Sequence, residues 1–213
     1  MDVVVAGGHG KIGQRLLRLL AERGDTARGL IRNPDHSADL EALGAEPVVC
    51  DMEREDDLGP FVEGADAAVF AAGAGPGSGP ERKRTVDLGA AVKLIDASKA
   101  VGIDRYVMVS SIGADHPERG SEQMRPYLEA KAEADRALQA SGLDHTIVRP
   151  GMLTDEPGSG RIRAGEDLGR DKVSRDNVAA TLAQVLGAGN TVGLTFVLLD
   201  GDTPIEQAVR ELG

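Results

Sequence analysis

The chain has 213 residues, with 24 Lys and Arg against 35 Asp and Glu, which gives a formal net charge of −11. This length favours one domain over residues 1–213 and leaves little room for a separate substrate domain. The acidic balance, together with only three Phe, two Tyr and no Trp, argues against a nucleic-acid-binding surface.

The first predicted strand, residues 3–6, runs into a glycine-rich turn and then a helix over residues 11–23. Glycine suits a place where a pyrophosphate approaches main-chain N–H groups, because no Cβ intervenes, and the helix presents its positive end there. The spacing G-x-G-x-x-G fits Gly8, Gly10 and Gly13, and G-x-x-G-x-x-G fits Gly7, Gly10 and Gly13. Following a first strand, the turn predicts dinucleotide binding rather than a plain connection. The expected contacts are Gly7, Gly8, His9, Gly10, Lys11, Ile12 and Gly13.

The second predicted strand, residues 27–31, ends at Arg32 and Asn33. An NAD site usually has Asp or Glu there to bind the ribose 2′-hydroxyl, whereas a guanidinium suits a 2′-phosphate. Arg32 therefore favours NADP over NAD, with a solvated surface arginine as the alternative.

The third predicted strand, residues 47–50, ends at Asp51 and Met52. Asp51 is expected to accept a hydrogen bond from the adenine amino group and Met52 to cover the ring. The alternative is that Asp51 caps a helix starting near Glu53, where the acidic residues 53–57 would complement the helix dipole.

The rest of the chain continues the alternation of strands and helices. Strands are expected at residues 67–71, 106–110, 145–148 and 195–199, and helices at 81–101, 124–140 and 174–186. This order predicts an α/β, Rossmann-type, doubly wound parallel sheet with helices on both faces and a small C-terminal substrate region. Residues 73–80 and 155–172 are expected to be irregular, either as substrate loops or as plain connectors, and residues 151–173 are predicted to lie on the substrate side.

Two residues of the helix at 124–140 suggest acid–base chemistry. Tyr127 and Lys131 lie one helical turn apart, so the ammonium can stabilise a phenolate that exchanges a proton with a substrate oxygen. Ser110 and Ser111 end the preceding strand and offer a hydroxyl to orient that oxygen. The alternative is a half-buried Tyr127 beside a solvated Lys131.

These motifs together resemble an atypical short-chain dehydrogenase/reductase of the small NAD(P)H-binding, NmrA-like or epimerase/dehydratase-like branch. The resemblance covers nearly the whole chain and rests on the glycine turn, Arg32 and the segments 71–73, 109–115, 127–131, 147–151 and 174–179. It implies NADP binding, with Tyr127 as the catalytic acid/base, Lys131 on the ribose hydroxyls and Ser111 positioning the reacting oxygen. Asp87 stands where relatives usually have Asn, and an ionised Asp only accepts hydrogen bonds. The cofactor contacts expected beyond those already named are Ala71, Ala72, Gly73, Ser110, Lys131, Pro150, Gly151 and Met152.

The resulting hypothesis is an NADP(H)-dependent oxidoreductase acting on a small carbonyl, alcohol or quinone-like substrate. The alternatives are a non-catalytic NADP(H) sensor and an NAD(P)-dependent epimerase or dehydratase, although the segment after Gly151 leaves little to hold a second nucleotide. Scattered histidines predict no metal site. The single Cys50 excludes an intrachain disulfide, and no export-type or membrane-spanning segment is evident, so a cytoplasmic protein without membrane contact is expected. A small-molecule substrate is the expected partner, and oligomerisation is compatible with the sequence.

Overall fold

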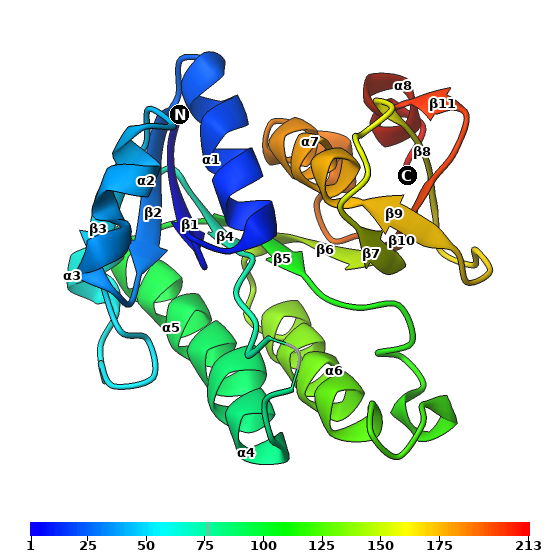
Figure 1. The fold of residues 1–213 in the computed structure, drawn as a ribbon, viewed down its shortest axis with the longest axis horizontal. Coiled ribbons are helices and arrows are strands. Elements are labelled where there is room, and N and C mark those ends of the chain that lie inside the picture. The colour runs from blue at the N-terminus through cyan, green and yellow to red at the C-terminus, as the bar shows by residue number, and fades with distance from the viewer. Residues whose placement is uncertain (76) are drawn as a thin grey trace.

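A twisted sheet with helices on both sides forms the centre of the computed structural model, which describes residues 1–75 and 77–213 (Figure 1). Over these residues the sheet has nine strands in the order β11-β8-β10-β6-β5-β4-β1-β2-β3. The seven strands from β10 to β3 in this order all run parallel to one another. Strand β8 runs antiparallel to both of its neighbours, β10 and β11. The predicted doubly wound sheet is confirmed, because strands β1 to β6 follow the order 3-2-1-4-5-6.

The strands and helices have the following bounds. The strands are β1 Asp2–Ala6, β2 Thr26–Ile31, β3 Glu46–Val49, β4 Ala67–Phe70, β5 Arg105–Val109, β6 Asp144–Pro150, β7 Met152–Thr154, β8 Arg161–Gly165, β9 Lys172–Ser174, β10 Thr195–Asp200 and β11 Thr203–Pro204. The α-helices are α1 Lys11–Glu22, α2 Ser37–Glu41, α3 Gly59–Val62, α4 Pro80–Arg82, α5 Ala91–Val101, α6 Arg125–Gln139, α7 Arg175–Leu186 and α8 Ile205–Arg210. A π-helix, η2, spans Lys83–Ala90, and short 3₁₀ turns lie at η1 Pro34–His36, η3 Pro117–Arg119 and η4 Gly189–Thr191.

The central strands are buried on both faces, as β1 illustrates. Val3 and Val5 pack into a core shared with α1 and α7, while Val4 and Ala6 pack into a second core shared with α5 and α6. Figure 1 shows these two pairs of helices on opposite sides of the sheet. Burying such a valine contributes about 1.5–3 kcal/mol. Packing on both faces therefore fixes the carboxyl ends of β1, β4 and β5 at one edge, where the candidate site lies.

The expectation of an irregular segment over residues 155–172 holds for residues 155–160 and 166–171 but is wrong for residues 161–165. Residues Arg161–Gly165 form β8, which joins the main sheet beside β10, and β7 pairs with β9 in a separate two-stranded sheet. In β8 only Ile162 is fully buried, so the strand carries one apolar side chain between exposed polar ones. Such a short pattern is a weak local signal for a strand. The partner strand β10 lies about thirty residues further along the chain, so the pairing leaves no local mark in the sequence.

Two predicted helices also need correction. The helix expected over residues 81–101 is interrupted, because the π-helix η2 separates the short α4 from α5, which begins only at Ala91. The helix expected near Glu53 begins instead at Gly59, whose N–H donates to Asp57 Oδ1 at 2.8 Å. Glu53 itself lies in a turn and faces the candidate site. Along the described chain, no helix has both the length and the apolar character needed to cross a membrane.

Candidate functional site

The glycine turn packs so tightly that side chains would not fit. Gly7 has a φ of +83°, and a Cβ built on it would lie 2.8 Å from the Ala72 backbone. A Cβ on Gly13 would lie 2.2 Å from the Gly7 carbonyl oxygen. Helix α1 then begins at Lys11 with Gly10 as its N-cap, and within the described chain no side chain caps it. The first-turn N–H groups are thus available to an anion, as a dinucleotide pyrophosphate requires.

Gly8 has a different role from Gly7. A Cβ on Gly8 would lie 2.8 Å from Gly29 Cα in β2, so this glycine allows the turn to pack against the neighbouring strand. Gly7 and Gly10 line the adjoining cleft, whereas Gly8 is not among its lining residues. Of the two glycine spacings in the sequence, the one that starts at Gly7 therefore follows the cleft.

A cleft of about 400 Å³ opens beside this turn. The predicted cofactor contacts that line it are Gly7, His9, Gly10, Arg32, Asn33, Asp51, Met52, Ala71, Ala72 and Gly73. The predicted contacts outside this lining are Gly8, Lys11, Ile12, Gly13, Ser110, Lys131, Pro150, Gly151 and Met152. Lining residues that the sequence analysis missed are Leu30, Ile31, His36, Cys50, Glu53, Ala74, Arg82, Val86 and Ala90. Arg82, Val86 and Ala90 recur at four-residue steps after a glycine-rich loop, which is the signal that could have revealed them.

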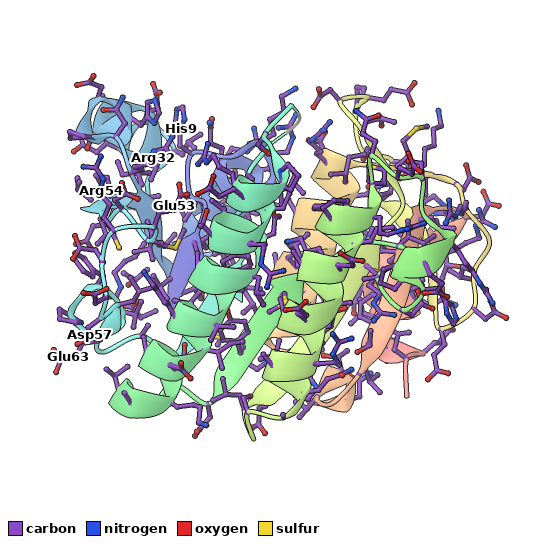
Figure 2. All side chains as sticks on the ribbon, turned by 90° about the horizontal axis from the view of Figure 1, so that it is seen from below. His9, Arg32, Glu53, Arg54, Asp57 and Glu63 are labelled. Carbon is purple, nitrogen blue, oxygen red and sulfur yellow. The ribbon has the colours of Figure 1, made fainter. Side chains whose placement is uncertain are left out.

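At the Arg32 end of the cleft, a carboxylate lies among cationic side chains. Glu53 Oε2 accepts hydrogen bonds from Arg82 at 2.7 Å and from Arg32 at 3.3 Å, and Glu53 Oε1 accepts one from Thr85 at 2.8 Å. The hydrogen bond from Arg82 is the main cause of a lowered pKa of Glu53, and partial burial opposes it. Figure 2 shows Arg32, Glu53 and His9 in the same corner of the molecule. The carboxylate is therefore ionised at neutral pH and paired with both guanidinium groups.

The neighbouring thiol is less reactive than usual. Cys50 lies at the end of β3 and lines the cleft, but it is only 3% exposed. Burial raises the pKa of Cys50 to about 11. At neutral pH this side chain is a protonated, apolar part of the cleft wall.

Tyr127 and Lys131 both lie on α6, and the lysine is buried. Lys131 is 3% exposed, which contradicts the alternative of a solvated lysine. Its Nζ donates to the Val109 carbonyl at 3.1 Å, lies 3.5 Å from Asp87 Oδ1 and lies 5.9 Å from the centre of the Tyr127 ring. The charge is thus held beside the phenol where little water can screen it.

Asp87 connects this cluster to the cleft. It is fully buried on η2, and its Oδ2 accepts a hydrogen bond at 3.2 Å from the N–H of Ala74, which lines the cleft. A Cβ on Gly73 would lie 3.1 Å from Asp87 Oδ1. Single π-helical turns are frequent at functional sites because they redirect side chains. Here the π-helix brings Asp87 between the lysine and the loop after β4.

A second lysine, which the sequence analysis missed, lies beside the same phenol. Lys83 Nζ is 5.2 Å from the centre of the Tyr127 ring and donates to the Gly75 carbonyl at 2.8 Å. Lys83 and Asp87 are four residues apart on η2, so this helix contributes both a cation and an anion to the surroundings of Tyr127 and Lys131. Tyr127 is therefore flanked by two ammonium groups from different helices.

The two candidate serines differ in their surroundings. The buried Ser110 donates to Asp135 Oδ2 at 2.9 Å, and the same oxygen accepts from Arg149 at 3.0 Å. Burial raises the pKa of Asp135, while the hydrogen bonds from Ser110 and Arg149 oppose that rise. Ser111 is half-buried, and among the described residues its hydroxyl donates a single 3.3 Å hydrogen bond, to the Ile112 carbonyl, so it is the freer of the two to meet a ligand.

The segment after β6 contacts the start of α1, next to the glycine turn. A Cβ on Gly151 would lie 2.2 Å from the Asp171 carbonyl oxygen, and Met152 is 69% exposed. Asp155 accepts hydrogen bonds from Lys11 on α1 and from Arg175 on α7. The Lys11 side chain thus ties the start of α1 to a loop more than a hundred residues further along the chain.

The fold, the glycine turn and the cleft define a dinucleotide-binding protein of the Rossmann class. A sequence profile of the family described as NAD(P)H-binding matches residues 7–188. Over 214 residues the chain is 42% identical to the "uncharacterized sugar epimerase YhfK" of Bacillus subtilis, with 100% of both chains covered. The chain belongs to the NAD(P)H-binding family.

Solved structures agree with this assignment. A putative NAD-dependent epimerase/dehydratase from Bacillus halodurans superposes with a TM-score of 0.95 at 38% identity over 100% of both chains. The oxidoreductase ylbE from Lactococcus lactis superposes with a TM-score of 0.88 at 25% identity over 100% of this chain and 96% of its own. The predicted resemblance to the NAD(P)H-binding, epimerase/dehydratase-like branch is confirmed, and a nicotinamide dinucleotide is the cofactor that this family binds.

Proposed function

We propose that this protein is an NADP(H)-dependent oxidoreductase that reduces or oxidises a small carbonyl, alcohol or quinone-like substrate. The observation that carries the proposal is the buried ammonium of Lys131 beside the Tyr127 phenol, joined through Asp87 to the loop that lines the cleft. In that position the ammonium can stabilise the negative charge that develops on the phenol oxygen as its proton passes to a substrate oxygen.

The glycine turn and the cleft beside Arg32 would hold NADP(H), and the chemistry that the bound cofactor would supply is hydride transfer to or from the substrate carbon. Tyr127 donates its hydroxyl proton to the carbonyl oxygen, and Lys131 stabilises the phenolate that remains. The Val109 carbonyl and Asp87 hold Lys131 in place, so this charge needs no reorganisation when the proton moves. Ser111 orients the reacting oxygen. In the oxidative direction Tyr127 accepts the proton from an alcohol.

An NAD(P)-dependent epimerase or dehydratase is the second candidate, because the Bacillus subtilis relative carries the name of a sugar epimerase. The same Tyr127 and Lys131 would serve, since epimerisation also begins with removal of a hydroxyl proton. Within residues 151–213, β10 and α7 pack into the core beside the sheet, so these two elements are not free to hold a sugar nucleotide.

Replacing Tyr127 by Phe tests the proposal. In a screen of NADPH oxidation with quinones, aldehydes and ketones, Y127F is expected to lose turnover by about 10²–10⁴-fold while NADP⁺ affinity stays the same. The matched control is Y106F, which makes the same chemical change at a tyrosine buried in the core. Unchanged turnover in Y127F would exclude the phenol as the proton donor. If the unmodified protein binds NADPH but none of the tested substrates causes its oxidation, a non-catalytic sensor becomes the better hypothesis.

A further inference from the structure

Two arginines from different parts of the chain meet at one carboxylate oxygen. Arg32 comes from the end of β2 and Arg82 from the end of α4, and each donates to Glu53 Oε2. Because a single oxygen accepts from both, the two guanidinium groups already lie close enough to share one small anion. Their partner in this structure is part of the chain itself.

This cluster is open to a ligand. Arg32, Glu53 and Arg82 all line the cleft, and their side chains are 59%, 26% and 43% exposed. An ion pair with this exposure is weak, because water screens it and the side chains lose conformational freedom in forming it. A dianion that offers several oxygens to the two guanidinium groups would form more and stronger hydrogen bonds than Glu53 does.

We propose that Arg82 completes a 2′-phosphate subsite with Arg32, and that Glu53 is an internal anion that occupies this subsite until the phosphate of NADP displaces it. The inference rests on the NADP preference in the proposed function and deepens it. Arg32 alone marks the subsite in the sequence, whereas Arg82 supplies the second cation and Glu53 sets how strongly the subsite favours a phosphate. A neutral ribose 2′-hydroxyl cannot form comparably strong hydrogen bonds with the two guanidinium groups.

The backbone around Glu53 has its own anchor, so its side chain can move without loss of the turn. Lys93 Nζ on α5 donates to the carbonyl oxygens of Met52 and Glu55, at 3.2 and 2.5 Å. These bonds do not involve the Glu53 carboxylate. The variant E53Q is therefore expected to fold, and its amide oxygen can still accept from Thr85 while it no longer neutralises the arginines.

The experiment measures binding of two fragments by titration calorimetry: adenosine 2′,5′-bisphosphate and adenosine 5′-monophosphate. R82Q is expected to lower the affinity for the bisphosphate by about tenfold and to leave that for the monophosphate unchanged. E53Q is expected to raise the affinity for the bisphosphate by up to about fivefold without raising that for the monophosphate. NADP⁺ and NAD⁺ should follow the same pattern. The matched control is R84Q, since Arg84 is an exposed arginine on the same helical segment and is absent from the cleft lining.

A purely structural role for the cluster predicts a different result. In that case R82Q would lower the affinity for both fragments equally, or for neither. E53Q would lower the affinity for the bisphosphate along with that for the monophosphate. Either outcome overturns the subsite. Neither depends on turnover, so failure of this inference is distinguishable from failure of the proposed oxidoreductase, which Y127F tests.

Discussion

The nucleotide side and the proposed catalytic side of the same sheet edge are built in different ways. On the nucleotide side, the turn and cleft use main-chain groups and exposed side chains such as Arg32. On the catalytic side, Lys131 and Asp87 are buried, and their contacts join α6, η2 and β5. The difference indicates that the cofactor cleft tolerates exposed, weak ion pairs, whereas the proposed proton transfer would use a charge that the core holds in place.

The largest expected effect comes from breaking the buried pair. K131M would leave Asp87 buried and unpaired, and should lower the free energy of unfolding by about 3–5 kcal/mol. The double variant K131M/D87N removes the unpaired charge and should recover most of that loss, but not turnover. Urea denaturation measures the first effect and NADPH oxidation the second. Equal stability of K131M and the unmodified protein would mean that the pair is not buried as described.

An intermediate effect is expected from the glycine turn. G13A places a Cβ against the Gly7 carbonyl, and such overpacking costs about 1–3 kcal/mol. Because the strain falls on the turn itself, nucleotide affinity should be lost even where the protein remains folded. G187A is the matched control, since a Cβ at Gly187 would meet nothing within 4 Å. Nucleotide binding by folded G13A at full affinity would contradict this view of the cradle.

The smallest effect concerns Cys50 and leaves stability unchanged. Because burial raises the pKa of Cys50 to about 11, the thiolate is scarce at neutral pH and reaction with iodoacetamide should be slow. The rate should rise about tenfold per pH unit up to that pKa, and bound NADP⁺ should slow it further by covering the cleft. Mass spectrometry of the alkylated protein gives the rate, with urea-unfolded protein as the reference. Fast labelling at neutral pH would show that the cleft wall is open at this residue.

The sequence was informative about the nucleotide side because its determinants are local. The glycine turn and Arg32 follow β1 and β2 directly, and the strand ends of a doubly wound sheet meet at one edge, so the order of motifs is enough to place them. Arg32, Asp51 and Met52 therefore line the cleft as expected, together with Gly7, His9 and Gly10 of the turn, whereas Gly8, Lys11, Ile12 and Gly13 lie outside its lining.

The contacts that the sequence did not reveal connect distant segments. Glu53 was interpreted as the start of a helix, although its partners Arg82 and Thr85 lie about thirty residues further on. Lys83 beside Tyr127 was missed for the same reason. The strand β8 was missed because its partner β10 lies further along the chain, so no local periodicity marked it. Tyr127 and Lys131 were found from their spacing alone, but the burial of the lysine depends on three-dimensional packing.

The π-helix Lys83–Ala90 serves both sides of the sheet edge at once. It begins just after Arg82 and carries Asp87, so one helical segment joins the subsite proposed for the 2′-phosphate to the proposed proton-transfer cluster. Removing one residue from it would rewind the segment and rotate Arg82 by about 100° relative to Asp87. The length of this segment thus sets the spacing between the residues proposed to bind the 2′-phosphate and those proposed to act at the reacting end of the bound cofactor.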